Sequence, residues 1–120
     1  MSDENPRIEW VQKAGVKCLK FTFKNNLEEQ DAINAIAKWR AAFRLKFNEK
    51  IILIWDCVEM RGYDIKARNL WQGALKEMKS HIESIWLITN SSLIKVGAKV
   101  ISVFTSINIK IISSENEIII

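Results

Sequence analysis

The sequence predicts a single α/β domain over residues 1–120, in which a mixed β-sheet packs against helices. A length of 120 residues is typical of one domain, and 48% hydrophobic with 27% charged residues excludes a chain that is disordered throughout. Segments with strand-like and helix-like periodicity alternate along the chain in the order ββαβαβαβα. Because strands that alternate with helices are usually joined by crossovers, we expect mostly parallel strand pairing.

The first two strands are expected to form a hairpin. Residues 8–13 are the first strand-like segment, and Gly15 marks a turn after it. In the segment that follows, Leu19, Phe21 and Phe23 alternate with Lys and Thr residues. This period of two residues is typical of a strand with one buried face.

A first helix is expected after Asn26, because Glu29 follows three residues later in a capping-box pattern. Apolar residues then recur at helical spacing on one expected core face, which comprises Ala32, Ile33, Ile36, Trp39, Phe43 and Phe47. The pattern predicts an amphipathic helix that packs against the sheet.

The centre of the chain predicts a buried strand, a loop and a second helix. Residues 51–55 are all apolar and mostly β-branched or aromatic, which is typical of a central strand that ends at Asp56. The segment from Asp56 to Asp64 is expected to be a loop. The second helix is predicted from Asp64 to Ser80 by a helical repeat of Ala67, Leu70, Trp71, Ala74, Leu75 and Met78.

The last third of the chain predicts another strand, helix and strand. Residues 85–88 form a short apolar strand, and the polar segment 89–92 is expected to cap a helix from Leu93 to Phe104. A final strand is expected over residues 107–111. Ser114 and Glu117 repeat the capping-box pattern and predict a short last helix.

The charges point to no nucleic-acid partner. The 18 basic and 14 acidic residues give a net charge of +4 and are interspersed along most of the chain. Between residues 91 and 113 only Lys95, Lys99 and Lys110 are charged, and they are spread over a helix and a strand. Phosphate binding usually needs a clustered basic stripe, so we interpret these residues as a solvated face.

A cytoplasmic location is the simplest interpretation. Cys18 and Cys57 lie apart in apolar strand-like segments, where free cysteine usually behaves as a small hydrophobic residue of a reducing compartment. The acidic, polar first residues are unlike a signal peptide. No apolar run approaches the ~18 residues that a membrane span needs.

The sequence contains few residues in patterns that could form a catalytic site, and it therefore predicts a protein that is not an enzyme. His81 is the only histidine and lies at the end of the second predicted helix, so no metal site with ligand spacing is apparent. The glycines are isolated, which excludes phosphate-binding and dinucleotide-binding loops. We expect no cofactor.

A candidate binding site lies between the central strand and the second helix. Ligands and partners of open α/β sheets tend to bind at the carboxyl ends of strands, and a helix N-terminus favours an anion. The candidate residues are Asp56, Glu59, Arg61, Tyr63, Asp64, Lys66 and Arg68. A purely structural alternative is that Asp64 caps the helix and Gly62 makes a turn.

The third predicted helix carries more apolar residues than one core-facing stripe needs. Leu93, Val96, Val100 and Phe104 are the candidate residues of an apolar pocket or interface. Three alternatives follow from this excess: deep burial of the helix, a homodimer, or a pocket for a small apolar ligand.

The order of elements resembles the STAS domain, the fold of bacterial anti-sigma-factor antagonists. The resemblance rests on a hydrophobic strand, Leu53-Ile54-Trp55-Asp56, followed eight residues later by Asp64 at a helix start, and it covers roughly residues 8–120. The Trp-rich helices are also similar to the CRAL-TRIO lipid-binding branch of that fold.

The antagonists have Asp-Ser-Ser-Gly at that helix start, with a serine that a kinase phosphorylates. This chain has Asp64-Ile65-Lys66-Ala67, so Lys66 stands where the resemblance would place the phosphorylated serine. The resemblance implies a non-catalytic regulatory or interaction module with a protein partner. The alternative is a carrier of a small molecule or lipid in an apolar pocket near residues 93–104.

Overall fold

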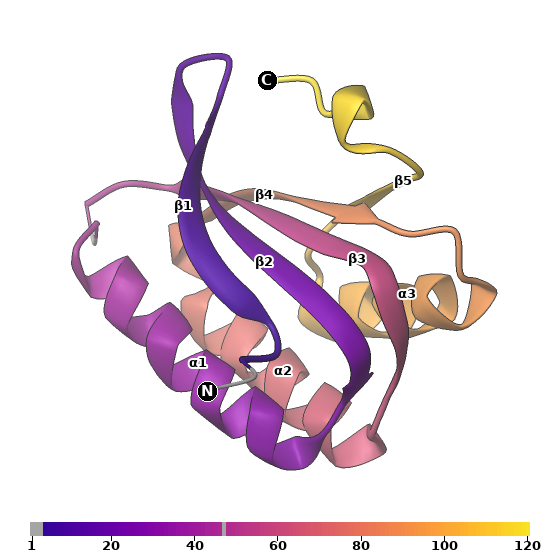
Figure 1. Ribbon diagram of the computed structural model, residues 1–120. Coiled ribbons are helices and arrows are strands. Elements are labelled where there is room, and N and C mark those ends of the chain that lie inside the picture. Colours follow the sequence, from indigo (N-terminus) through magenta and orange to yellow (C-terminus); the bar gives the residue numbers. More distant parts are fainter. Residues whose placement is uncertain (1–3, 47) are drawn as a thin grey trace.

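The computed structural model of the protein describes residues 4–46 and 48–120. In these residues the chain forms one five-stranded sheet with the strand order β1-β2-β3-β4-β5 (Figure 1). Its strands are β1 (Arg7–Lys13), β2 (Val16–Leu27), β3 (Ile51–Tyr63), β4 (Ile82–Ile88) and β5 (Ile109–Ile112). The β1–β2 pair is antiparallel and the other pairs are parallel, which confirms the predicted mixed sheet.

The helices α1 (Glu29–Arg44), α2 (Ile65–Met78) and α3 (Ser92–Thr105) all cover the same face of the sheet (Figure 1). This follows from the strand order. Each crossover from β2 to β5 steps to the next strand in the same direction, and right-handed crossovers then place every helix on one side. The short 3₁₀ turn η2 (Glu115–Glu117) lies on the other side of the sheet (Figure 1).

The main core lies between the sheet and the helices, and aromatic rings dominate its centre. Phe21 packs edge-on against Trp39, with ring centroids 5.3 Å apart, and against Trp71 at 5.8 Å. Trp55 joins this cluster and is 2% exposed. A smaller cluster of Cys18, Ile54 and Ile88 is buried on the other face of the sheet, with Ile118 packed against it.

Two strands continue further than predicted. The segment from Asp56 to Asp64 is not a loop, because β3 runs to Tyr63 and pairs with an extended β2 that runs to Leu27. The pairing is interrupted by two register shifts, one between Thr22 and Lys24 and one between Asn25 and Asn26. Each extension supplies hydrogen-bond partners for the backbone N–H and C=O groups of the other. Neither segment could pair these groups alone.

The start and the core face of α1 also differ from the prediction. Asn26 belongs to β2, and Glu28 is the N-cap; its backbone N–H donates to the Asp31 carboxylate at 3.0 Å. Ile33 is 46% exposed because it lies about 100° around the helix from the buried Ala32. Phe47, which was expected on the same face, lies outside the described residues.

The second helix and the last predicted helix are shorter than expected. Helix α2 ends at Met78, where the 3₁₀ turn η1 (Lys79–His81) begins, and Leu70 is 37% exposed rather than buried. The last predicted helix is the single turn η2, after which Ile118 is extended. The predicted cap of α3 is confirmed, since the Ser91 hydroxyl accepts the backbone N–H of Ile94 at 3.3 Å. Among the helices of residues 4–46 and 48–120, none combines the length and apolar character that crossing a membrane requires.

Candidate functional site

The end of β3, the start of α2 and the first turn of α3 meet at one corner of the fold. The backbone N–H of Asp64 donates to the carbonyl of Leu27 at 2.9 Å, and the Asn26 side-chain amide donates to the Asp64 carboxylate at 3.0 Å. A Cβ atom at Gly62 would lie 3.7 Å from a methyl group of Leu93. These contacts bring α3 against the end of β3.

Part of the predicted site is exposed at this corner. Glu59, Arg61 and Lys66 are exposed, and so are two large aliphatic side chains, Ile65 (65%) and Leu93 (52%). We call these five residues the corner surface. Sequence reasoning missed Ile65 as a site residue, although its place directly after the helix cap was a usable signal. The corner surface therefore combines aliphatic groups with charges of both signs.

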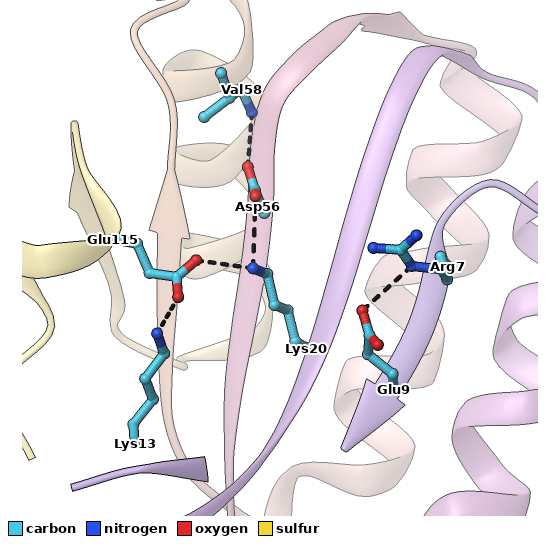
Figure 2. Close-up of polar contacts among 7 residues, drawn as sticks. All are labelled: Arg7, Glu9, Lys13, Lys20, Asp56, Val58 and Glu115. Carbon is cyan, nitrogen blue, oxygen red and sulfur yellow. Dashed lines mark hydrogen bonds and ion pairs between the residues drawn. The ribbon is translucent and has the colours of Figure 1, made fainter. Parts of the chain in front are cut away.

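Asp56 does not belong to the corner surface. It lies further back along β3, with its carboxylate 3.9 Å from the Lys20 ammonium and accepting the backbone N–H of Val58 at 3.2 Å (Figure 2). Lys20 also donates to Glu115 at 2.8 Å, and Lys13 binds the same carboxylate (Figure 2). Asp56 thus belongs to an ion-pair cluster that ties the C-terminal segment to the sheet.

Tyr63 and Arg68 are half-buried and line an apolar cavity of about 50 Å³ between β3, α2 and α3. The side of α3 that faces the cavity contributes Ile94, Gly97, Ala98 and Ile101. The cavity also includes Trp55, Cys57, Met60 and Trp71 among its lining residues. The structure therefore separates Tyr63 and Arg68 from the exposed residues that were expected to accompany them.

Gly97 permits the close packing of α3 on β3. A Cβ atom at this position would lie 2.5 Å from the Tyr63 hydroxyl oxygen and 2.8 Å from its ring carbon Cζ. A side chain at residue 97 would therefore displace Tyr63. Sequence reasoning missed Gly97, although a single glycine within an aliphatic helix was a signal for a close approach.

Two donor groups at the cavity are buried without a hydrogen-bond acceptor. The indole Nε1 of Trp55 and the guanidinium Nε of Arg68 have no partner among the residues that the structure describes. Both residues line the cavity. Trp55 was expected as a core residue, and its 2% exposure is consistent with that expectation.

The thiol of Cys57 is not poised for nucleophilic chemistry. Burial raises its pKa far above the ordinary thiol value, and the charge of the neighbouring Asp56 raises it further. A thiol with such a raised pKa stays protonated at neutral pH and is inert as a nucleophile. In the described part of the chain, no three His, Cys, Asp or Glu residues gather in a way that could hold a metal ion.

The four apolar candidates of α3 do not line the cavity. Leu93, Val96 and Phe104 are 52%, 58% and 59% exposed, and Val100 is half-buried. Because α3 turns about 100° per residue, the alternate apolar set of Ile94, Ala98 and Ile101 faces inward instead. The pocket that was expected near these four residues lies on the other side of the helix, and an interface role for them stays a prediction.

No family model matches the sequence, and no curated protein matches it either. The fold has a solved counterpart in an uncharacterized protein from the DUF3478 family with a SpoIIAA-like fold, from Shewanella loihica PV-4. The two chains share 16% sequence identity with a TM-score of 0.79, over 98% of this chain and 94% of the other. The protein therefore has a SpoIIAA-like fold, which confirms the expected STAS-like architecture.

Proposed function

We propose that the protein is a non-catalytic regulatory module that binds a protein partner through the corner surface. One observation carries this proposal: Ile65 and Leu93 expose more than half of their surface at the start of α2 and of α3, which meet the end of β3, and the exposed Arg61 and Lys66 are close to them in the sequence. Exposed aliphatic groups bordered by charges are typical of interaction sites. The STAS-like fold supports the proposal, since the sequence resemblance points to anti-sigma-factor antagonists.

Lys66 also bears on how such binding would be controlled. A lysine cannot accept the phosphoryl group that switches the serine of the antagonists, and it brings a positive charge instead of nearly two negative ones. The module is then constitutively competent to bind, or it is switched elsewhere. Together with Arg61, Lys66 favours a partner with an acidic surface.

The test compares two variants in which an exposed aliphatic residue becomes a glutamate. Ile65→Glu alters the corner surface, where Ile65 is 65% exposed, and Leu45→Glu alters a site directly after the end of α1, where Leu45 is 77% exposed. Partners captured from native lysate are identified by mass spectrometry, and their dissociation constants are then measured with purified proteins. We expect Ile65→Glu to weaken binding at least tenfold and Leu45→Glu to leave it unchanged.

Two results would contradict the proposal. One is that no protein binds the wild type more tightly than it binds an unrelated control domain. The other is that both glutamate variants bind the partner as the wild type does.

The cavity favours a second candidate function, the binding of a small apolar molecule. Its walls are formed mainly by aliphatic and aromatic side chains, and it lies at the carboxyl end of β3, where ligands of open α/β sheets tend to bind. Mass spectrometry of organic extracts from the purified protein tests this candidate directly. An extract without any co-purifying small molecule, together with no binding by added apolar compounds, would count against it.

A further inference from the structure

We infer that the partner protein binds the outward side of α3 with an amphipathic helix of its own, whose acidic side chains pair with Lys95 and Lys99. The inference rests on the proposed function, because Leu93 belongs to the corner surface, and it names the element that the partner presents. The contact then extends from the corner surface along α3.

The aliphatic residues on the outward side of α3 follow one another at intervals of three, four and three residues. They are Leu93, Val96, Val100 and Val103, and we call them the α3 seam. Leu93, Val96 and Val103 are 52%, 58% and 78% exposed, and Val100 is half-buried. At 1.5 Å per residue the seam runs for about 15 Å along the helix. Alternating intervals of three and four residues form the stripe with which one helix packs its side chains between those of another.

This spacing favours a helix over a lipid surface as the occupant of the seam. A lipid surface needs exposed apolar area in no particular order, whereas a second helix needs side chains at these intervals. A carboxylate also lies at the start of the seam. The exposed Asp64 accepts a hydrogen bond from Asn26, and a Cβ atom at Gly62 would contact both Asn26 and Leu93. A negative charge at this place opposes contact with anionic lipids.

The charges on the flank of the seam select an acidic helix. Lys95 and Lys99 are one helical turn apart and lie on the same flank. Both are exposed, and no ion pair joins either of them to a carboxylate among the residues that the structure describes. Residues 91–113 contain no aspartate or glutamate. Since charges on the flanks of paired helices determine which helices pair, the acidic residues have to come from the partner.

A second copy of the chain does not supply these acidic residues from its own α3. Because this helix has no aspartate or glutamate, two α3 helices packed together bring no carboxylate to Lys95 or Lys99. In antiparallel orientation the lysine flanks of the two copies would lie side by side, where like charges repel. The observations therefore favour a helix of a different protein.

The probes of the experiment are two synthetic peptides of about three heptads with leucine at the a and d positions. One peptide has glutamate at the flanking e and g positions, and the other has lysine there. Each peptide repels other copies of itself at neutral pH, so that it is available to pair with α3. NMR spectra record the methyl groups of the protein as each peptide is added at low salt.

We expect the glutamate peptide to shift the methyl resonances of Val96, Val100 and Val103 in a saturable manner. The lysine peptide should bind roughly tenfold more weakly, because its charges lie beside those of the protein. The double variant Lys95→Glu with Lys99→Glu should reverse this preference. Such a reversal requires that the flank of α3 contacts the flank of the peptide.

A matched pair of variants tests whether the contact lies on α3. Val96→Glu introduces a charge into the seam, and Val58→Glu introduces the same charge on β3, where the side chain is 61% exposed against 58% for Val96. Both positions are largely exposed, so both variants should fold as the wild type does, which spectra without peptide check. Val96→Glu should abolish binding of the glutamate peptide, and Val58→Glu should retain it.

Three results would overturn the inference. Equal affinities for the two peptides, or no binding of either, would exclude an acidic helix as the occupant. Sedimentation with vesicles of phosphatidylglycerol and phosphatidylcholine that Val96→Glu abolishes would assign the seam to a lipid surface. A dimer in analytical ultracentrifugation that Val96→Glu dissociates would assign the seam to a second copy.

The proposed function and this inference can fail separately. If the captured partner binds Val96→Glu as it binds the wild type but no longer binds Ile65→Glu, the corner-surface proposal holds and the inference is wrong. If Ile65→Glu changes nothing, the corner-surface proposal is wrong, and the peptide titration still decides whether the α3 seam binds an acidic helix.

Discussion

At Gly97, helix α3 packs closely on Tyr63 at the end of β3. We expect Gly97→Ala to destabilise the fold by about 1–3 kcal/mol, because the new methyl group would lie 2.5 Å from the Tyr63 hydroxyl oxygen. Urea unfolding measures the change. The matched control is Gly73→Ala in α2, where no atom of the described residues, apart from the local helix backbone, lies within 4 Å of the added Cβ.

Gly73→Ala should stabilise the protein by about 0.5–1 kcal/mol, since alanine favours a helix more than glycine does. If Gly97→Ala stabilises the protein by a similar amount, Tyr63 moves away without penalty and the packing of α3 on β3 is looser than described.

Ile54 tests the smaller core on the second face of the sheet. Its side chain is fully buried beside Cys18 and Ile88. Ile54→Ala should therefore cost about 2–5 kcal/mol of unfolding free energy, through lost apolar burial and the cavity that remains. Val58→Ala on the same strand, where the side chain is 61% exposed, should change stability by less than about 0.5 kcal/mol. A loss below about 1 kcal/mol for Ile54→Ala would show that this face is not a core.

At the scale of elements, the C-terminal segment is held to the sheet by charge. Two hydrogen bonds lower the pKa of Glu115 below its ordinary value of 4.5. The hydrogen bond from Lys13 contributes most, and the one from Lys20 contributes less. A carboxylate with a lowered pKa stabilises the folded state above its unfolded pKa, and that contribution is lost as the pH falls through the folded pKa. The attachment of η2 should therefore weaken in acid.

The pH dependence can be measured with Glu115→Gln. At neutral pH this variant should be less stable than the wild type by about 0.5–1 kcal/mol, as is typical of partly exposed ion pairs. The difference should shrink as the pH falls below the ordinary pKa of about 4.5 and should vanish once the pH has passed below the lowered pKa of the folded state. Urea unfolding across this pH range measures both. A difference at acid pH that is as large as the difference at neutral pH would show that Glu115 stabilises the segment without its charge.

Helix α3 presents apolar side chains on two sides. The inward set lines the cavity and completes the core, while Leu93, Val96 and Phe104 face outward. A helix with this distribution has a larger apolar girth than a helix with a single core-facing stripe. The excess of apolar residues in α3 is therefore divided between two sides of the helix. The fold buries the inward side and leaves the outward side exposed.

At the scale of the whole molecule, the placement of the helices gives the sheet two different faces. All three helices of the described residues cover one face, and the turn η2 with Ile118 covers part of the other (Figure 1). The corner surface lies where β3, α2 and α3 meet, so a partner can reach it without displacing either cover.

The proposed partner binding at this corner should be sensitive to salt, because the corner surface includes the exposed basic residues Arg61 and Lys66. If Arg61 and Lys66 attract an acidic partner, the dissociation constant should rise several-fold when the ionic strength increases from about 0.05 to 0.5 M. Titration calorimetry at several salt concentrations measures this, and Lys66→Met should flatten the dependence. A dissociation constant that does not change with salt would show that the contact is apolar and that Lys66 is not its determinant.

The order of elements and most of the core were predictable because they depend on the periodicity of residues that are neighbours in the sequence. An apolar run such as residues 51–55 predicts a buried strand, and the repeat from Ala67 to Met78 predicts a helix face, whatever the rest of the chain does. The resemblance of Leu53-Ile54-Trp55-Asp56 and Asp64 to the STAS pattern then predicted the fold, which the structural counterpart confirms.

The site depended on contacts between distant residues, and only the tertiary structure decided it. The segment after Asp56 is a strand because β2 continues beside it, and a hydrogen-bonding partner some 35 residues away leaves no local periodicity. Periodicity also reveals that α3 has more apolar residues than one face needs, but not which side the sheet covers. The unpaired N–H groups of Trp55 and Arg68 were also not predictable, because all the elements packed around a buried donor decide whether it finds an acceptor.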